Sequence, residues 1–436
     1  MIEYKNKVFT GNWRELNSTE YQYGSLEINS NGDSKLSVLG IFPKKWNEID
    51  NIPETLVGNF IETQSRNCFT IILYKYNGSG RTMSTLSNYY LSYRFTLIGD
   101  KVVEKKIENL HFDEIMVSSD SFQKTVTTDD IEINHDPLED WINYKAKYAP
   151  PLEIYKDDFQ RVYIWWRSTF PLANSHRIIL QRPAWLNISF TEAINIESCF
   201  EQKNKIEQFF TFLNKQHVSF EYLDINHICG LPFKVLGIKK STDWGVKRQY
   251  LNILEGNSFE FYRNWLNIYE KIGFATETFH NALIDRELSV ENKFLSFCFS
   301  LELYHRELYA KFESLESRNS KIISRIREVL KRKGDLATWF NKFTSAEKET
   351  TFKNRILDLL NDSDLELNLD LDDYSSRIRD TRNKLVHLEE LQKNPFSNKE
   401  LIQNIKIISD LFINHIYKRI VPFEAEDDLE KIKLDI

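Results

Sequence analysis

The sequence YSSRIRDTRNKLVHLEEL, residues 374–391, separates apolar from polar side chains with the period of a helix. At about 100° of rotation per residue, five mainly apolar residues fall within roughly 80° of the helix circumference. This set consists of Tyr374, Ile378, Thr381, Leu385 and Leu388. The spacing therefore predicts an amphipathic helix that packs on a helical core through these residues.

The opposite side of this helix is cationic. Arg379, Asn383 and His387 follow one another at i, i+4 spacing, and Arg382 lies one turn from Arg379. Val386 falls on the same side. We expect these side chains to point away from the domain's own core. The plain alternative is a solvated helix face whose terminal histidine is favoured by the helix dipole.

Other segments of the second half show the same period. Phe261, Trp265, Ile268 and Ile272 form one stripe. Helical patterns cover residues 261–272, 294–308, 320–332, 351–361, 374–391 and 398–420. The acidic segment 361–373 predicts a linker that caps the 374–391 helix through Asp372 or Asp373. The second half is therefore predicted to be all-α.

The first half alternates apolar and polar residues with the period of strands. In YGSLEINSNGDSKLSVLG, residues 23–40, Leu26 and Leu36 lie on either side of an Asn-Gly turn, which predicts a hairpin. Further strands are expected at 68–76, 89–99, 111–119, 161–170 and 232–240, with one helix at 196–216. The predicted fold is therefore α+β with two domains: a mainly antiparallel, sandwich-like β domain over residues 1–250, then a helical bundle over 251–436, with the boundary between about Lys240 and Asn257.

Composition narrows the function classes. The net charge of −7 excludes a general polyanion binder, so any contact with RNA must use a local cationic patch. The cysteines, Cys68, Cys199, Cys229 and Cys298, lack the spacing of a zinc pair or a CxxC motif. No metal and no cofactor is predicted. The sequence shows neither a signal-peptide core nor a membrane span, so we expect a cytoplasmic protein without membrane contact.

Two sets of motifs resemble known families. RNKLVH, residues 382–387, fits the R-x4-6-H signature of HEPN ribonucleases, and RIRDTRNKLVHLEE with FLSFCFSLELYHRELY resembles the Apea-like HEPN group over roughly residues 258–421. FTGNWREL, YGSLEINSNG and LEDW resemble the ApeA N-terminal domain. This resemblance implies an antiphage protein that acts by abortive infection, with an RNase held inactive until a phage-derived trigger is present.

The resemblance also implies metal-independent cleavage of RNA, in which the 2′-hydroxyl attacks the adjacent phosphorus. His387 would move protons because histidine titrates near neutral pH. Arg382 would stabilise the transition-state charge with its planar, permanently charged fork. Asn383 would fix the histidine ring or donate to the phosphate.

Arg382 and His387 lie about 140° apart around a helix and about 7.5 Å along it, so one helix does not bring them together on one phosphate. HEPN proteins dimerise through the motif helix, which implies a homodimer or a larger homo-oligomer. Glu302 is a candidate acid between the approaching cations. Glu302 and His305 could equally form a hydrogen-bonded core pair, and Arg379 fits a surface or interface role better than catalysis. The alternative function is a non-catalytic HEPN module that binds a nucleotide or a partner protein.

Overall fold

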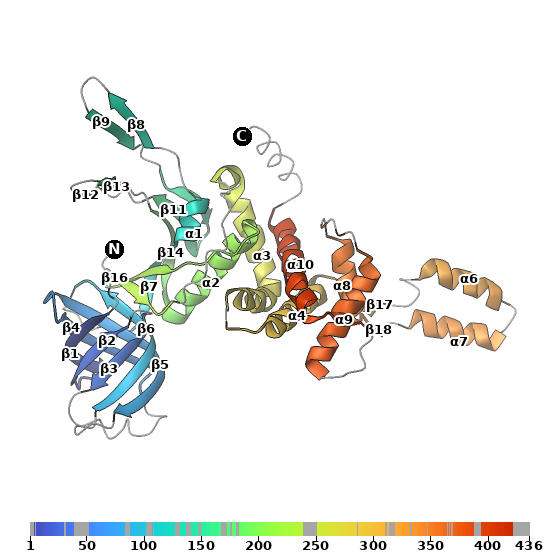
Figure 1. The fold of residues 1–436 in the computed structure, drawn as a ribbon, viewed down its shortest axis with the longest axis horizontal. Helices are drawn as coiled ribbons and strands as arrows, with labels where there is room; N and C mark the ends of the chain where they lie inside the picture. The colour runs from blue at the N-terminus through green and yellow to red at the C-terminus, as the bar shows by residue number, and fades with distance from the viewer. Residues whose placement is uncertain are drawn as a thin grey trace. The chain divides into compact units, whose positions relative to one another are not determined.

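The computed structural model describes most of the chain in separate stretches. These are residues 4, 6–29, 32–38, 52–82, 88–101, 107, 109–126, 131–136, 141–146, 150–166, 172–174, 177–179, 183–238, 251–285, 287–309, 312–313, 319–331, 334–346, 348–363, 365, 367, 369–387 and 394–421. The chain divides into a strand-rich unit, residues 1–207 and 218–260, and a helical unit, residues 208–217 and 261–436 (Figure 1).

The first strands of the strand-rich unit close on themselves. They are β1 (Lys7–Glu15), β2 (Gln22–Ile28), β3 (Ser34–Val38), β4 (Thr55–Glu62), β5 (Cys68–Thr82) and β6 (Asn88–Gly99). Their order is β6-β3-β2-β1-β4-β5, and β5 also pairs with β6, so every strand of this barrel has two neighbours. The predicted hairpin is confirmed, because Leu26 of β2 lies opposite Leu36 of β3.

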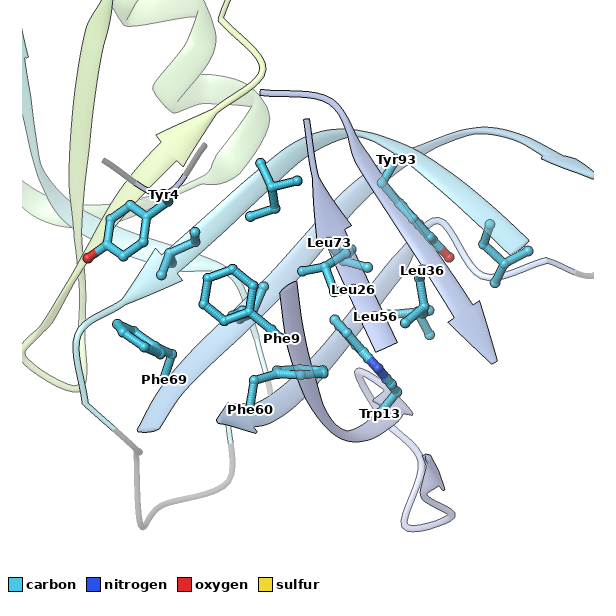
Figure 2. Packing of buried hydrophobic residues seen from close by; sticks show 14 of the residues in the cluster. Tyr4, Phe9, Trp13, Leu26, Leu36, Leu56, Phe60, Phe69, Leu73 and Tyr93 are labelled. Carbon is cyan, nitrogen blue, oxygen red and sulfur yellow. The ribbon is translucent and has the colours of Figure 1, made fainter. Parts of the chain in front are cut away.

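The barrel interior is filled with apolar side chains, as expected of a small closed sheet (Figure 2). The rings of Trp13 and Phe60 lie 3.7 Å apart between centroids. This contact depends on Gly58, because a Cβ there would come within 2.5 Å of Cε2 of Phe60. Glycine at this position therefore leaves room for the Phe60 ring beside residue 58 of the same strand.

The same sheet continues beyond the barrel from β6. The added strands are, in spatial order, β16 (Leu231–Leu236), β15 (Tyr222–His227), β7 (His111–Ser118), β14 (Ala184–Asn195), β11 (Gln160–Trp166) and β10 (Leu152–Lys156). Two small hairpins, β8 (Ile131–Asp136) with β9 (Trp141–Ala146) and β12 (Leu172–Asn174) with β13 (Arg177–Ile179), are separate. The described ladders are all antiparallel, which confirms the predicted β class.

Two helices accompany the sheet. The short α1 (Asp120–Thr125) begins at Ser119, whose side chain accepts a hydrogen bond from the Phe122 amide. The longer α2 (Ile196–Leu213) matches the helix predicted at 196–216. The end of α2 is assigned to the helical unit, because Phe212 packs against Trp265, Phe279 and Phe412.

The helical unit contains α3 (Leu251–Ile284, whose first ten residues are assigned to the strand-rich unit), α4 (Val290–Leu308), α6 (Ser320–Leu330), α7 (Gly334–Ser345), α8 (Phe352–Asn361), α9 (Leu371–His387) and α10 (Asn398–Ile420). The helix α4 packs against α8, α9 and α10. The predicted all-α character is confirmed, although α7 is a helix that the periodicity analysis missed. Part of the expected domain boundary, residues 239–250, lies outside the described residues.

A two-stranded stem of β17 (Phe312–Glu313) and β18 (Lys348–Glu349) joins α6 and α7 to the bundle. Figure 1 shows α6 and α7 side by side beyond this stem. Within the described ranges, no helix is both long enough and apolar enough to cross a bilayer.

Candidate active site

The helix that carries RNKLVH, residues 382–387, is α9, and its first turn is capped by Asp370. The Asp370 carboxylate accepts hydrogen bonds from the amides of Asp372 at 2.9 Å and Asp373 at 3.2 Å. The expectation that Asp372 or Asp373 is the cap is therefore wrong. These two carboxylates lie inside the first turn, where they still interact favourably with the helix dipole.

The apolar side of α9 packs largely as predicted. Tyr374, Ile378 and Thr381 are buried, and Leu385 is half-buried. Leu388, the last residue of the predicted stripe, lies outside the described residues. The Tyr374 hydroxyl donates to Oδ1 of Asn404 on α10 at 2.6 Å. The helix is therefore held in the bundle by its first three turns, and its last turn is less covered.

Arg382 does not simply point into solvent. Its side chain is 33% exposed, and a guanidinium nitrogen lies 3.5 Å from Oε2 of Glu302 on α4. The guanidinium carbon lies 5.1 Å from the ring centroid of Phe352 at the start of α8, a cation–π contact. The expectation of an outward Arg382 is wrong because a helical wheel contains no information about α4 and α8. Two contacts thus orient the guanidinium group, while one third of the Arg382 side chain remains exposed.

Glu302 is shared between two guanidinium groups. Its side chain is only 14% exposed, and its Oε1 accepts a hydrogen bond from Arg306 at 2.8 Å. Arg306 in turn lies 3.1 Å from Glu349 of β18. Alternating charges therefore run from the stem of the α6–α7 hairpin to Arg382. Such an arrangement holds cations in place at a lower entropic cost than isolated pairs on flexible side chains.

His305 is buried and directed toward α8. Its Nε2 lies 3.1 Å from Oδ2 of Asp358, and its Nδ1 lies 3.3 Å from a guanidinium nitrogen of Arg355. Because a guanidinium can only donate, Nδ1 accepts and Nε2 carries the proton that is donated to Asp358. The ring also stacks on Tyr309 at 4.8 Å. These contacts fix His305 in the interface between α4 and α8.

The remaining predicted site residues lie along α9. Asn383 is half-buried, with its Oδ1 3.5 Å from an Arg382 nitrogen. His387 is exposed and is the last residue of the helix. Arg379 forms two hydrogen bonds, of 2.7 and 2.9 Å, with Oδ1 of the buried Asp380. The structure thus brings Arg382, Asn383 and Glu302 together, while His387 stands at the exposed end of the helix.

A cysteine lies close to this group. Burial raises the pKa of the Cys298 thiol well above its usual range, and the nearby Arg382 guanidinium acts in the opposite direction without cancelling the effect of burial. The thiol therefore stays protonated at neutral pH. A protonated buried thiol is a poor nucleophile, so Cys298 acts as a small apolar residue beneath the arginine.

Sequence reasoning missed three residues of this site. Arg306 follows Glu302 at i+4, a spacing that could have indicated the pair. Asp380, directly after Arg379, was not identified as its partner. Phe352 lies thirty residues from Arg382 in the chain, and no local pattern connects the two.

Comparison with protein-family profiles gives two matches. Residues 8–227, half of the chain, match ApeA N-terminal domain 1, and residues 295–426 match Apea-like HEPN. The second match contains Glu302, Arg382, Asn383 and His387. No curated protein and no solved structure matches the chain. The chain belongs to the ApeA family, with ApeA N-terminal domain 1 followed by an Apea-like HEPN domain.

Proposed function

We propose that this protein is a metal-independent HEPN endoribonuclease that acts in antiphage defence by abortive infection. Its family membership supports an antiphage function of the HEPN type. The observation that carries the enzymatic proposal is the placement of Arg382, one third exposed and held by Glu302 and Phe352, on the same helix as the exposed His387.

The chemistry follows from these residue types. The 2′-oxygen of the RNA attacks the adjacent phosphorus, a new 2′-O–P bond forms, and the P–O5′ bond breaks. Arg382 stabilises the extra negative charge on the phosphate oxygens, and Asn383 donates to the same group. His387 accepts the 2′-hydroxyl proton or supplies a proton to the leaving 5′-oxygen. The products are a 2′,3′-cyclic phosphate end and a 5′-hydroxyl end.

A homodimer or a larger homo-oligomer completes the site. The separation of Arg382 and His387 along α9, about 7.5 Å, is too large for one helix to converge on one phosphate. Two facing α9 helices would place the arginine of one copy near the histidine of the other. The exposed last turn of α9, with Val386 and His387, leaves room for this approach. Arg379 is assigned to this interface, and Glu302 and His305 to support of Arg382 and of the α4–α8 packing.

The N-terminal part, over about residues 1–250, is assigned to sensing a phage-derived trigger, to restraining the nuclease or to positioning its RNA substrate. We assign the protein to the cytoplasm. The helical domain over about residues 251–436 carries the nuclease.

The decisive experiment incubates the purified protein with total RNA in the presence of EDTA and maps the product ends. We expect cleavage that persists in EDTA and leaves cyclic phosphate ends. His387→Ala should reduce the rate by about a hundredfold or more, whereas Lys384→Ala, which removes an exposed cation from the same helix, should leave it unchanged. Parental cleavage by His387→Ala would remove His387 from the chemistry, and loss of cleavage in EDTA would make the reaction metal-dependent. A parental protein that does not cleave RNA at all would favour the alternative, a non-catalytic HEPN module that binds a nucleotide or a partner protein.

The dimer has its own test. Arg382→Ala and His387→Ala proteins are mixed after dissociation and allowed to re-form dimers. If each site uses residues of both copies, about a quarter of the parental activity returns, because about half of the dimers are mixed and each mixed dimer has one intact site. A mixture that stays inactive although the copies exchange would place both residues of a site in one copy.

A further inference from the structure

The hairpin of α6 and α7 has an inner face that holds its two helices together. Arg327 of α6 donates to Oδ1 of Asn341 at 2.7 Å and to Oγ1 of Thr344 at 3.4 Å on α7. Ile323 and Thr344 are buried. These contacts define the side on which each helix meets the other.

A second apolar face of the hairpin is exposed. It consists of Ile322, Ile326 and Val329 on α6 and Leu336, Trp339 and Phe343 on α7. Val329 is 76% and Trp339 59% exposed, and a group of exposed apolar side chains of this kind is typical of an interaction surface. The rings of Trp339 and Phe343 stack at 5.4 Å, so the α7 part of this face is flat.

These six side chains lie on one side of the hairpin. At about 100° per residue, the exposed apolar residues of each helix lie roughly 100–140° around the helix axis from the residues that contact the other helix. The direction of this rotation, viewed along the chain, is the same in α6 and α7. In an antiparallel pair of helices, rotation in the same sense places both sets on the same side of the pair. We call this surface the hairpin face. A shallow apolar strip between two helices is the shape that a third, amphipathic helix covers.

The edges of the hairpin face are basic. Lys321 and Arg325 border it on α6 and Lys342 borders it on α7, all exposed. Residues 320–345 contain seven Lys or Arg against two Asp or Glu, whereas the whole chain carries a net charge of −7. Two such faces would repel each other, so a second hairpin is a poor occupant. An amphipathic helix with acidic edges fits both the apolar strip and its rim.

The chain itself carries such a sequence. Residues 422–436 contain six Asp or Glu and two Lys. Ala425, Leu429, Ile432 and Ile436 follow one another at steps of four, three and four, which is the spacing of one helix face. Read as a helix, residues 425–436 would be about 18 Å long. The lengths of α6 and α7, with 11 and 12 residues, are about the same.

The two segments also begin near one another. The Tyr309 hydroxyl, three residues before β17, donates to the carboxylate of Asp362 at 2.6 Å. Lys418, three residues before the end of the described α10 segment at Val421, donates to the Asp362 carbonyl at 3.0 Å. We propose that residues 422–436 bind the hairpin face as an acidic amphipathic helix, with Leu429 and Ile432 against the apolar strip.

The test uses the full-length chain with Leu429→Asp and Ile432→Asp, which removes the apolar side of the native segment and leaves the hairpin intact. The probe is a fluorescent peptide of residues 422–436, and binding is measured by anisotropy. We expect saturable binding that weakens at higher salt, because the rim pairs are exposed. The parental chain, with its own segment in place, should bind the probe at least about tenfold more weakly.

Matched changes locate the site. Adding Val329→Asp to the test chain should weaken binding of the probe at least about tenfold. Arg325→Glu should weaken binding of the probe more than Lys331→Glu, because Lys331 is an exposed cation just after α6 that faces away from the hairpin face on the helical wheel. Circular dichroism melts establish that each variant remains folded. A peptide with the same composition in scrambled order should not bind.

Three results would overturn the proposal. These are equal binding of the scrambled peptide, equal binding by the Val329→Asp chain, and displacement of the probe by a short single-stranded RNA, which would assign the face to nucleic acid. None of these measurements depends on RNA cleavage, so the proposal can fail while the nuclease assignment stands.

Discussion

Arg382→Ala and His387→Ala should both abolish cleavage but should differ in stability. Arg382 contributes a cation–π contact with Phe352, worth about 0.5–1 kcal/mol. It also contributes a partly exposed ion pair with Glu302 at 3.5 Å, worth about 0.5 kcal/mol. The expected loss of unfolding free energy is therefore about 1–1.5 kcal/mol. His387 is exposed at the end of α9, so its removal should cost under about 0.5 kcal/mol.

The assay is urea denaturation followed by far-ultraviolet circular dichroism, with thermal melts alongside. For a helical unit of this size, the loss at Arg382 should lower Tm by about 3–5 °C. Lys384→Ala is the matched control, since it removes an exposed cation from the same helix. A double-mutant cycle of Arg382→Ala with Phe352→Leu should give a coupling energy of about 0.5–1 kcal/mol.

The reasoning is refuted if Arg382→Ala and His387→Ala have the same stability, or if the coupling energy with Phe352 is zero within error. Either result would mean that Arg382 is a solvated surface residue. Its role in cleavage would then depend entirely on contacts made in the complex with RNA.

Three further outcomes are expected. Burial lowers the pKa of His415 below its ordinary 6.5, so the unfolded chain takes up a proton at a higher pH than the folded chain. The contribution of His415 to the free energy of unfolding should therefore be complete above pH 6.5 and should fall by up to about 1.4 kcal/mol per pH unit below it. Urea melts of His415→Gln should show a shallower decline with falling pH than those of the parent. Glu349→Ala should cost about 1–2 kcal/mol of unfolding free energy because it removes a carboxylate from the almost fully buried Arg355 and from Arg306. A loss no larger than that of the exposed Glu328→Ala would contradict a stabilising role for the alternating charges between the stem and Arg382. Limited proteolysis should cut between about residues 240 and 250 or within 361–373, and a single cut near residue 150 would contradict the proposed division.

Much of the fold was predictable because local patterns determined it. The Asn-Gly turn with alternating apolar residues located the β2–β3 hairpin, and the 3.6-residue period located α4, α8, α9 and α10. The closure of the barrel was not predictable, because it depends on pairing between β5 and β6 in a register that no single strand encodes.

The helix α7 could have been predicted in part. Its apolar residues Leu336, Trp339 and Phe343 follow one another at steps of three and four, the spacing of one helix face, but the segment is short. Its glycine and its two threonines also have low helix propensity. Tertiary contact with α6 through Arg327 compensates for this weak local preference.

For the candidate site, the sequence identified the residue types and the helix but not their surroundings. The wheel separated Arg382 from the apolar stripe, but it did not show that Arg382 contacts Glu302, which lies eighty residues away in the chain. Which contacts cover a residue on a helix surface depends on the neighbouring helices, and their positions follow from packing that sequence periodicity does not record.

The assignment of Gln208–His217 to the helical unit means that the helical domain is not a portable module. A chain that begins at residue 251 would lack Phe212, and the aromatic side chains of Trp265, Phe279 and Phe412 would lose a neighbour that fills the space between them. Truncation would thus open a hole in the bundle, at a cost of about 3–5 kcal/mol by analogy with phenylalanine-to-alanine substitutions. Evolutionary exchange of N-terminal regions among such proteins would have to carry the end of α2 along with the helical domain.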